Sequence, residues 1–245
     1  MKQEKTDLQQ QVQAWAEMAI AQYDEIKNDW EKKHHKKWNY GFYNQSPLNQ
    51  LTKQPEYFII QFNPGSAGPY IKPTPESFLE GNPCWDSRNG WGNSNNLKSL
   101  FSQVQENNPL KDDSNIFTNA SFFNTPNAKD LPYEIWKRTL PITLQLAEIV
   151  QPKRILVLSK KIIDNIKKID PKCDVFQTED LCPIIWHGQI HGIDTIYTYH
   201  PSARLRKDAR EDLNMQMARL IGLWDEKTSL TEALALAIAE KKSKK

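Results

Sequence analysis

A short apolar run that ends at a polar turn constrains the fold of this chain most. Residues 57–62 read Tyr-Phe-Ile-Ile-Gln-Phe, and Asn63, Pro64 and Gly65 follow directly. Aromatic and β-branched residues in this pattern predict a buried strand, which Pro and Gly end because they disrupt the ladder. Asn63 therefore stands at the carboxyl end of a strand. Ligands bind at that edge of parallel α/β sheets, so we expect its amide to face a crevice.

A second segment near the C-terminus has the same form. The β-rich run at 195–199 ends in His200, Pro201 and Ser202. Two strand ends thus deliver an Asn and a His, each followed at once by Pro. Either tripeptide alone is most often a simple turn. The pairing of the two motifs within one domain is therefore the informative feature.

Strand-like and helix-like segments alternate along the chain, which predicts a parallel sheet between helix layers. Beyond the two motif strands we expect strands at 116–121 and 154–159, and helices at 8–31, 97–104, 132–150 and 203–223. The predicted fold is a three-layer α/β/α domain around a mainly parallel, four-stranded sheet. We divide the chain into an N-terminal helical extension (1–50), this domain (51–224), and a C-terminal helix with a basic tail (225–245).

The two motifs together resemble the signature of the uracil-DNA glycosylase superfamily. The Asn-Pro-Gly form is most similar to the single-strand-selective monofunctional uracil glycosylases, and next to the mismatch-specific uracil/thymine glycosylases. The resemblance extends over about residues 57–220. It implies a DNA partner and an enzyme that flips a pyrimidine out of the stack and hydrolyses its N-glycosidic bond, leaving an abasic site.

The resemblance also implies roles for individual residues. Asn63 would orient the attacking water, and a neutral His200 would donate a hydrogen bond to the departing base. Asn119 matches the asparagine that reads the base edge, although it could also serve only as a strand-end cap. For the ring that stacks on the base we favour Phe78 over Tyr70, which lies nearer the first motif.

Further residues would contact DNA. Arg204 takes the place of the residue that fills the hole left by the flipped base, and Ser66 and Ser202 would contact flanking phosphates. Basic residues cluster directly after His200: Arg204, Arg206, Lys207 and Arg210. A net charge of +2 does not itself identify a nucleic-acid binder. The position of the cluster, at the rim of the expected site, is what suggests contact with phosphates.

The sequence leaves the substrate open. Gly65 stands where uracil-specific branches carry a Tyr that blocks the 5-position of the base, so a 5-modified pyrimidine would fit. The loop that carries Trp85 and Trp91 could line the extra volume, grip DNA or only cover the core. Two biological roles are open for such an enzyme: repair of DNA, or attack on foreign DNA that carries modified bases. The alternatives are a non-catalytic DNA-binding module that retains the fold and a hydrolase of small nucleosides.

The sequence does not favour strand cleavage, a metal or cofactor site, or a membrane or secreted location. Neither motif carries a lysine in an attacking position, so we expect no strand cleavage. The three cysteines, Cys84, Cys173 and Cys182, cannot supply a four-cysteine cluster, and the histidines lack metal-ligand spacing, so we expect no cofactor and no metal. No apolar run approaches a membrane span, and no secretory signal is present. We therefore expect a cytoplasmic monomer.

Overall fold

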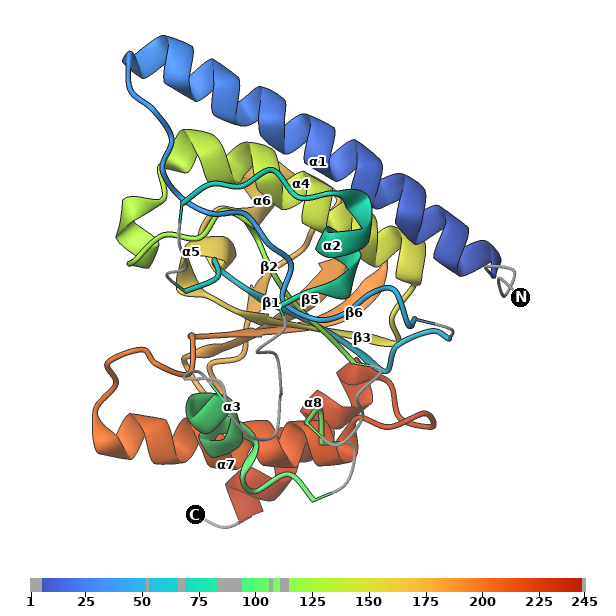
Figure 1. Ribbon diagram of the computed structural model, residues 1–245. Coiled ribbons are helices and arrows are strands. Elements are labelled where there is room, and N and C mark those ends of the chain that lie inside the picture. The colour runs from blue at the N-terminus through green and yellow to red at the C-terminus, as the bar shows by residue number, and fades with distance from the viewer. Residues whose placement is uncertain are drawn as a thin grey trace.

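The computed structural model describes residues 6–51, 53–65, 69–82, 94–105, 108–110 and 115–243, with side chains in the fourth segment from residue 97 onward. Predictions on Ser66, Cys84 and the Trp85/Trp91 loop lie outside these residues. The chain forms an α/β fold in which helices cover both faces of one sheet (Figure 1). None of the helices in the described part has the length and apolar character that a bilayer crossing requires.

The sheet has six strands in the order β2-β1-β3-β6-β5-β4. They are β1 (Tyr57–Gln61), β2 (Ile116–Asn119), β3 (Arg154–Leu158), β4 (Phe176–Gln177), β5 (Ile185–Ile190) and β6 (Ile193–Thr198). Strands β2, β1, β3 and β6 are parallel, whereas β5 and β4 are antiparallel at one edge. The expectation of four strands was wrong because β5 interrupts its apolar pattern with polar residues and β4 spans only two exposed residues.

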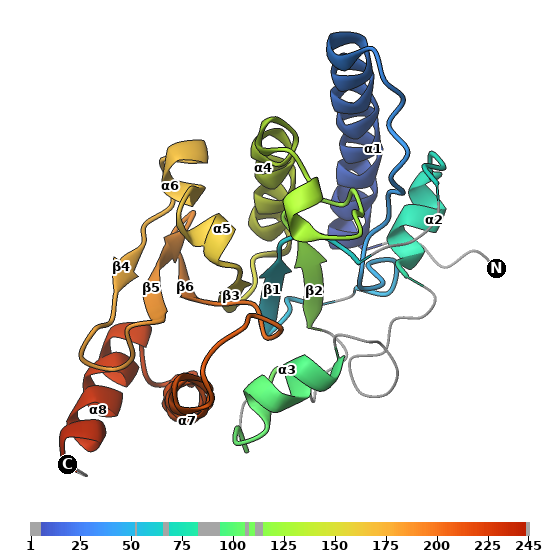
Figure 2. The ribbon, with the colours of Figure 1, turned by 90° about the vertical axis from the view of Figure 1, so that its left-hand side faces the viewer.

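The helices form two layers. On one face lie α1 (Asp7–His34), α2 (Pro75–Glu80), α4 (Tyr133–Val150), α5 (Lys160–Ile163) and α6 (Ile166–Ile169). On the other lie α3 (Ser94–Phe101), α7 (Lys207–Leu223) and α8 (Leu230–Ser243) (Figure 2). A short 3-10 helix, η1 (Ala128–Asp130), follows β2. Each layer has its own apolar core against the sheet, so β1, β2, β3 and most of β6 are buried on both sides.

Helix α1 belongs to the first of these cores. A capping box between Thr6 and Gln9 starts the helix, and its apolar stripe packs on α4. The indole N–H of Trp15 donates to the Ile142 carbonyl oxygen at 3.0 Å, and the Tyr23 hydroxyl accepts the Phe122 backbone N–H at 2.9 Å. Burial of each such aromatic side chain contributes about 1.5–3 kcal/mol. The N-terminal segment is therefore integrated with the sheet domain, and it supports the loop after β2.

The strand order creates a crevice at one edge of the sheet. The chain leaves β1 toward β2 on one side, and it leaves β3 toward β6 on the other. Connections that diverge from adjacent parallel strands leave a crevice at the carboxyl ends of those strands. Asn63 follows β1, Ser159 follows β3, and His200 follows β6. The topology thus brings three segments, distant in sequence, to one edge.

Candidate functional site

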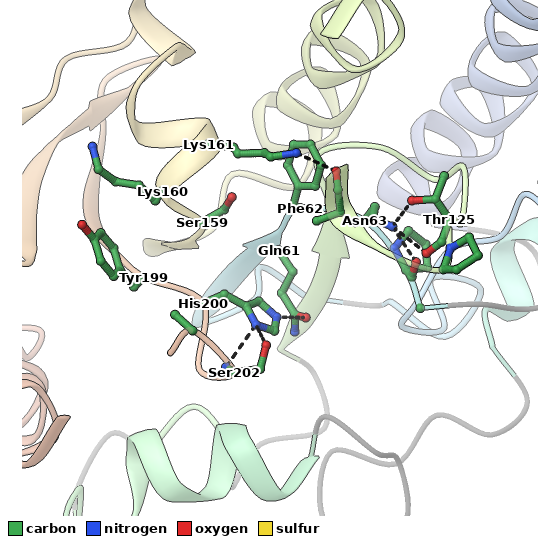
Figure 3. Close-up of a pocket in the computed structure, with 15 residues that line it drawn as sticks. Gln61, Phe62, Asn63, Thr125, Ser159, Lys160, Lys161, Tyr199, His200 and Ser202 are labelled. Carbon is green, nitrogen blue, oxygen red and sulfur yellow. Dashed lines mark hydrogen bonds between the residues drawn. The ribbon is translucent and has the colours of Figure 1, made fainter. Parts of the chain in front are cut away.

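A pocket of about 660 Å³ occupies this edge (Figure 3). Its lining comes from the ends of β1, β3 and β6 and from the loop after β2. The lining residues are Gln61, Phe62, Asn63, Pro64, Gly65, Thr125, Pro126, Ala128, Ser159, Lys160, Lys161, Tyr199, His200, Ser202 and Ala203. The volume falls within the range of about 300–1,000 Å³ that small-molecule sites have. Asn63 and His200 therefore face a common pocket.

The amide of Asn63 is held in one orientation by the loop after β2. Its Nδ2 donates to Thr125 Oγ1 at 3.0 Å and to the Pro64 carbonyl oxygen at 2.9 Å. Thr125 Oγ1 can accept this bond because its own proton goes to the Asn127 carbonyl oxygen at 2.7 Å. Both amide protons are thereby engaged. Asn63 Oδ1 has no donor among the described residues, so it is available as an acceptor in the pocket.

The hydrogen bonds of His200 fix its tautomer. Nδ1 accepts the backbone N–H of Ser202 at 3.2 Å and lies 2.6 Å from Ser202 Oγ. Because Nδ1 accepts, the proton of the neutral ring resides on Nε2, which lies 3.3 Å from Gln61 Oε1. Desolvation by burial lowers the pKa of His200 to about 4. At neutral pH the ring is thus an uncharged N–H donor.

Gln61 is the nearest partner of this donor. It is the last residue of β1 and is only 4% exposed. In the sheet it pairs with Asn119, the last residue of β2. Gln61 is not part of either sequence motif. The signal was present, since Gln61 is the one polar residue in the apolar run before Asn63.

The side of the pocket next to Gly65 is open. A Cβ added at Gly65 would meet no atom within 4 Å. The Gly65 carbonyl oxygen accepts the Tyr43 hydroxyl at 3.3 Å, which ties this turn to the segment before β1. A side chain at this position would therefore project into free space. The effect that the sequence predicts for this glycine, room for a 5-substituent, stays a prediction.

Lys160, Lys161 and Tyr199 line the β3 and β6 side of the pocket. Lys161 Nζ donates to the Ala128 carbonyl oxygen and lies 4.6 Å from the Phe62 ring centre. Desolvation by burial lowers the pKa of Lys161. Tyr199 stacks on Trp186 with ring centres 5.8 Å apart. The motifs gave no indication of Lys161 because it follows β3, a strand outside both of them.

Two predicted substrate-binding residues do not line the pocket. Phe78 is in the core, 1% exposed, and stacks on Trp15 and Phe42 with ring centres 5.7 and 5.0 Å away. The prediction that Phe78 stacks on a base is wrong because α2 directs this ring against α1. Asn119 is 2% exposed behind the lining, and its Nδ2 finds no hydrogen-bond partner. A buried donor of this kind can be satisfied by a ligand or a water.

The predicted DNA-contacting residues fall into two groups. Arg204, Arg206 and Lys207 are exposed beside the pocket, the last two with only long ion pairs to acids on α7. Ser202 instead contacts His200 and lines the pocket. Arg210, in the same cluster by sequence, donates to the carbonyl oxygens of Pro201 and Ala203, the former at 2.7 Å. Arg210 therefore braces the loop that carries the histidine motif.

Comparison with known proteins adds no family to this picture. No protein-family model matches the sequence, and a search of curated proteins found no match. The features of this chain from which a function can be inferred are its two motifs and the pocket that they line.

Proposed function

We propose that this protein is a monofunctional DNA glycosylase that flips out uracil or a 5-modified pyrimidine and hydrolyses its N-glycosidic bond. The observation that carries the proposal is the pairing, in one pocket, of a free amide oxygen on Asn63 with a neutral N–H donor on His200. Cleavage of this bond needs a water on the sugar and a donor on the departing base. The pocket supplies one group for each need.

The two groups act on opposite charges. Positive charge develops on the sugar, and a water held by Asn63 Oδ1 is positioned to attack it. Negative charge develops on the base, and His200 Nε2–H stabilises it once the base oxygen replaces Gln61 Oε1, whose contact at 3.3 Å is long. An amide cannot take the proton of the water as a carboxylate can. We therefore expect slower chemistry than in enzymes with an aspartate at this position.

The shape of the pocket favours a base with a 5-substituent. Gly65 leaves its wall open, and the volume of about 660 Å³ exceeds what an unmodified pyrimidine needs. Asn119, the strand partner of Gln61, does not line the pocket, so its partnerless Nδ2 would pair with a carbonyl oxygen of the base only after Gln61 moves aside. Rotation of the same amide would suit a cytosine derivative. A pyrimidine with a 5-hydroxymethyl or larger group is thus our proposed substrate class.

The decisive test is mass spectrometry of bases released from oligonucleotides. The substrates contain uracil, 5-hydroxymethyluracil, thymine mismatches, and 5-hydroxymethylcytosine with and without a sugar. We expect the wild type to release a 5-modified base and Asn63→Ala to release none. Asn28→Ala, on the exposed side of α1, is the control and should match the wild type. Gly65→Tyr should retain uracil release and lose release of the 5-substituted base.

Two outcomes would contradict the proposal in different ways. DNA binding without release of any base would indicate a non-catalytic module with this fold. A covalent adduct trapped by borohydride would contradict the monofunctional mechanism, and loss of that adduct in Lys161→Arg would identify the attacking amine. Excision confined to uracil would remove the proposed role against modified foreign DNA and leave repair.

A further inference from the structure

A cluster of possible metal ligands lies at the end of β6 opposite the pocket. Asp170 follows α6, Cys173 lies between α6 and β4, and His191 begins the turn between β5 and β6. One ligand atom from each residue lies within 4.8 Å of the other two. His200 and the pocket are at the other end of β6. The cluster is therefore separate from the proposed glycosylase site.

The backbone holds these three side chains in place. Asp170 Oδ1 accepts the backbone N–H of Lys172 at 3.0 Å, which turns Oδ2 toward His191 Nε2, 2.6 Å away. The backbone N–H of His191 donates to the Lys172 carbonyl oxygen at 3.3 Å. Cys173 forms a β-bridge with Ile190. Contacts between residues 170–173 and residues 190–191 thus hold the possible metal-ligating atoms in place before an ion binds.

We propose that Asp170, Cys173 and His191 bind a Zn²⁺ ion, with a water as the fourth ligand. Thiolate sulfur, imidazole nitrogen and carboxylate oxygen are the protein ligands that this cation takes, in tetrahedral geometry. Ligand atoms around such an ion are about 3.3–3.8 Å apart, as follows from Zn–ligand bonds of about 2.0–2.3 Å. Binding would draw the sulfur inward and move the carboxylate and the ring roughly 0.7 Å apart.

Glu148 on α4 supplies a second, independent observation. Its Oε1 lies 2.6 Å from His191 Nδ1, the ring nitrogen that faces away from Asp170. The contact is an ion-pair contact without hydrogen-bond geometry, and the His191 side chain is only 10% exposed. A carboxylate behind the second nitrogen is the usual outer partner of a metal-bound histidine, and it orients the ring. A small rotation of the ring onto the ion would complete this arrangement.

The cysteine distinguishes metal binding from a simpler arrangement. A protonated His191 between Asp170 and Glu148 would form a charge bridge without any metal. That bridge gives no role to the thiol of Cys173, which is fully buried and forms no disulfide among the described residues. One carboxylate, one imidazole nitrogen and one thiol directed at one point favour a divalent cation. The ion would tie the segment before β4 to the β5–β6 turn at the antiparallel edge of the sheet.

Cobalt provides a direct test on the full chain. The protein is stripped of metal with a chelator and titrated with Co²⁺, which takes zinc sites and absorbs light. We expect visible bands of a tetrahedral ion and a near-ultraviolet band from thiolate-to-metal charge transfer, both abolished by added Zn²⁺. Cys173→Ser should lose the near-ultraviolet band. Glu148→Gln should weaken binding about 10–100-fold, as loss of an outer partner does.

The control is Cys182→Ser, a buried cysteine in the core on the other face of the sheet. This variant should retain both bands, and circular dichroism should show that all variants are folded. Retained charge transfer in Cys173→Ser, or its loss in Cys182→Ser, would overturn the proposal. If Cys173→Ser does not fold, the wild type still decides. Wild type that shows no charge-transfer band and no rise in melting temperature with Zn²⁺ would leave only the charge bridge.

Discussion

At the scale of single residues, the loop after β6 determines the charge of His200. Ser202 donates its backbone N–H to Nδ1, and the ring is partly buried. Both features favour the neutral ring with its proton on Nε2. In the state that it has at neutral pH, the ring can therefore donate a hydrogen bond from Nε2–H to the departing base anion. The activity that we propose should therefore change little with pH between about 6 and 8, where this ring remains neutral.

His200 itself should titrate near pH 4. Burial places its folded pKa at about 4, below the value of about 6.5 in the unfolded chain. The unfolded state then takes up the proton first, so the contribution of His200 to stability is lost as pH falls from about 6.5 toward 4. An NMR titration of the ring resonances measures the folded value. A midpoint near 6.5 would show that burial does not lower the pKa of this ring.

Thr125 should matter to the site through Asn63. Replacing Thr125 with Val removes the hydroxyl that accepts from Asn63 Nδ2 and donates to the Asn127 carbonyl oxygen. One hydrogen bond contributes about 0.5–1.5 kcal/mol, so we expect kcat for base release to fall about 3–10-fold with KM unchanged. Thr125→Ser retains the hydroxyl and should match the wild type. An equal loss in both variants would exclude this role.

Sequence alone located some site residues and missed others for a physical reason. Asn63 and His200 were predictable because each ends a β-rich run at a proline. Thr125 and Lys161 were not predictable, since their role depends on which loops meet across the sheet. Phe78 was misplaced because distance along the chain from Asn63 does not reveal that α2 turns its ring into the core.

At the scale of elements, α7 supports the site as well as the second core. Its Arg210 reaches the carbonyl oxygens of Pro201 and Ala203. Arg219, nine residues further along the helix, contacts Gln216 and Glu240. A planar guanidinium can bind two carbonyl groups at once, whereas an ammonium acts as a point charge. Arg210 is thus a positioning residue for the loop that carries the histidine motif.

Replacing Arg210 with Lys should loosen this loop while the fold remains intact. We expect faster hydrogen exchange at the Ala203 amide, which donates to the His200 carbonyl oxygen at 2.8 Å, and a several-fold lower rate of base release. Arg219→Lys, on the same helix, is the matched control. Unchanged exchange at Ala203 in Arg210→Lys would show that the loop is held by other contacts.

The four parallel strands were recognisable because each is an apolar run bounded by turn residues. The antiparallel edge was not. In β5, Gly188 lies where an added Cβ would come within 2.0 Å of the Asp174 carbonyl oxygen. The residue is therefore a glycine because the segment before β4 passes close to it. In the sequence the same glycine weakens the strand pattern.

At the scale of the whole molecule, the position of the positive charges matters more for DNA binding than the net charge does. The chain carries a net charge of +2, yet Arg204, Arg206 and Lys207 stand exposed together beside the pocket. If DNA enters there, these side chains displace counterions from phosphates. Lys167 and Lys168 on α6 carry the same two positive charges as Arg206 and Lys207, and they do not line the pocket.

The salt dependence of DNA binding should reveal this arrangement. The double variant Arg206→Ala/Lys207→Ala should reduce the slope of log K against log salt by about one to two, because each lost phosphate contact removes about 0.7–0.9. The matched variant Lys167→Ala/Lys168→Ala should leave the slope unchanged. Equal effects in both variants would show that binding is not localised at the pocket.

The packing of α1 on α4 has a consequence for how the chain folds as it is made. Tyr23 finds its partner at Phe122, and the apolar stripe of α1 is covered by a helix that begins roughly a hundred residues further along the chain. At about 5–20 residues per second, a ribosome needs several seconds or more to produce that partner. Throughout this interval the newly made helix exposes its tryptophan and tyrosine to the cell, and it is then a natural target for chaperones.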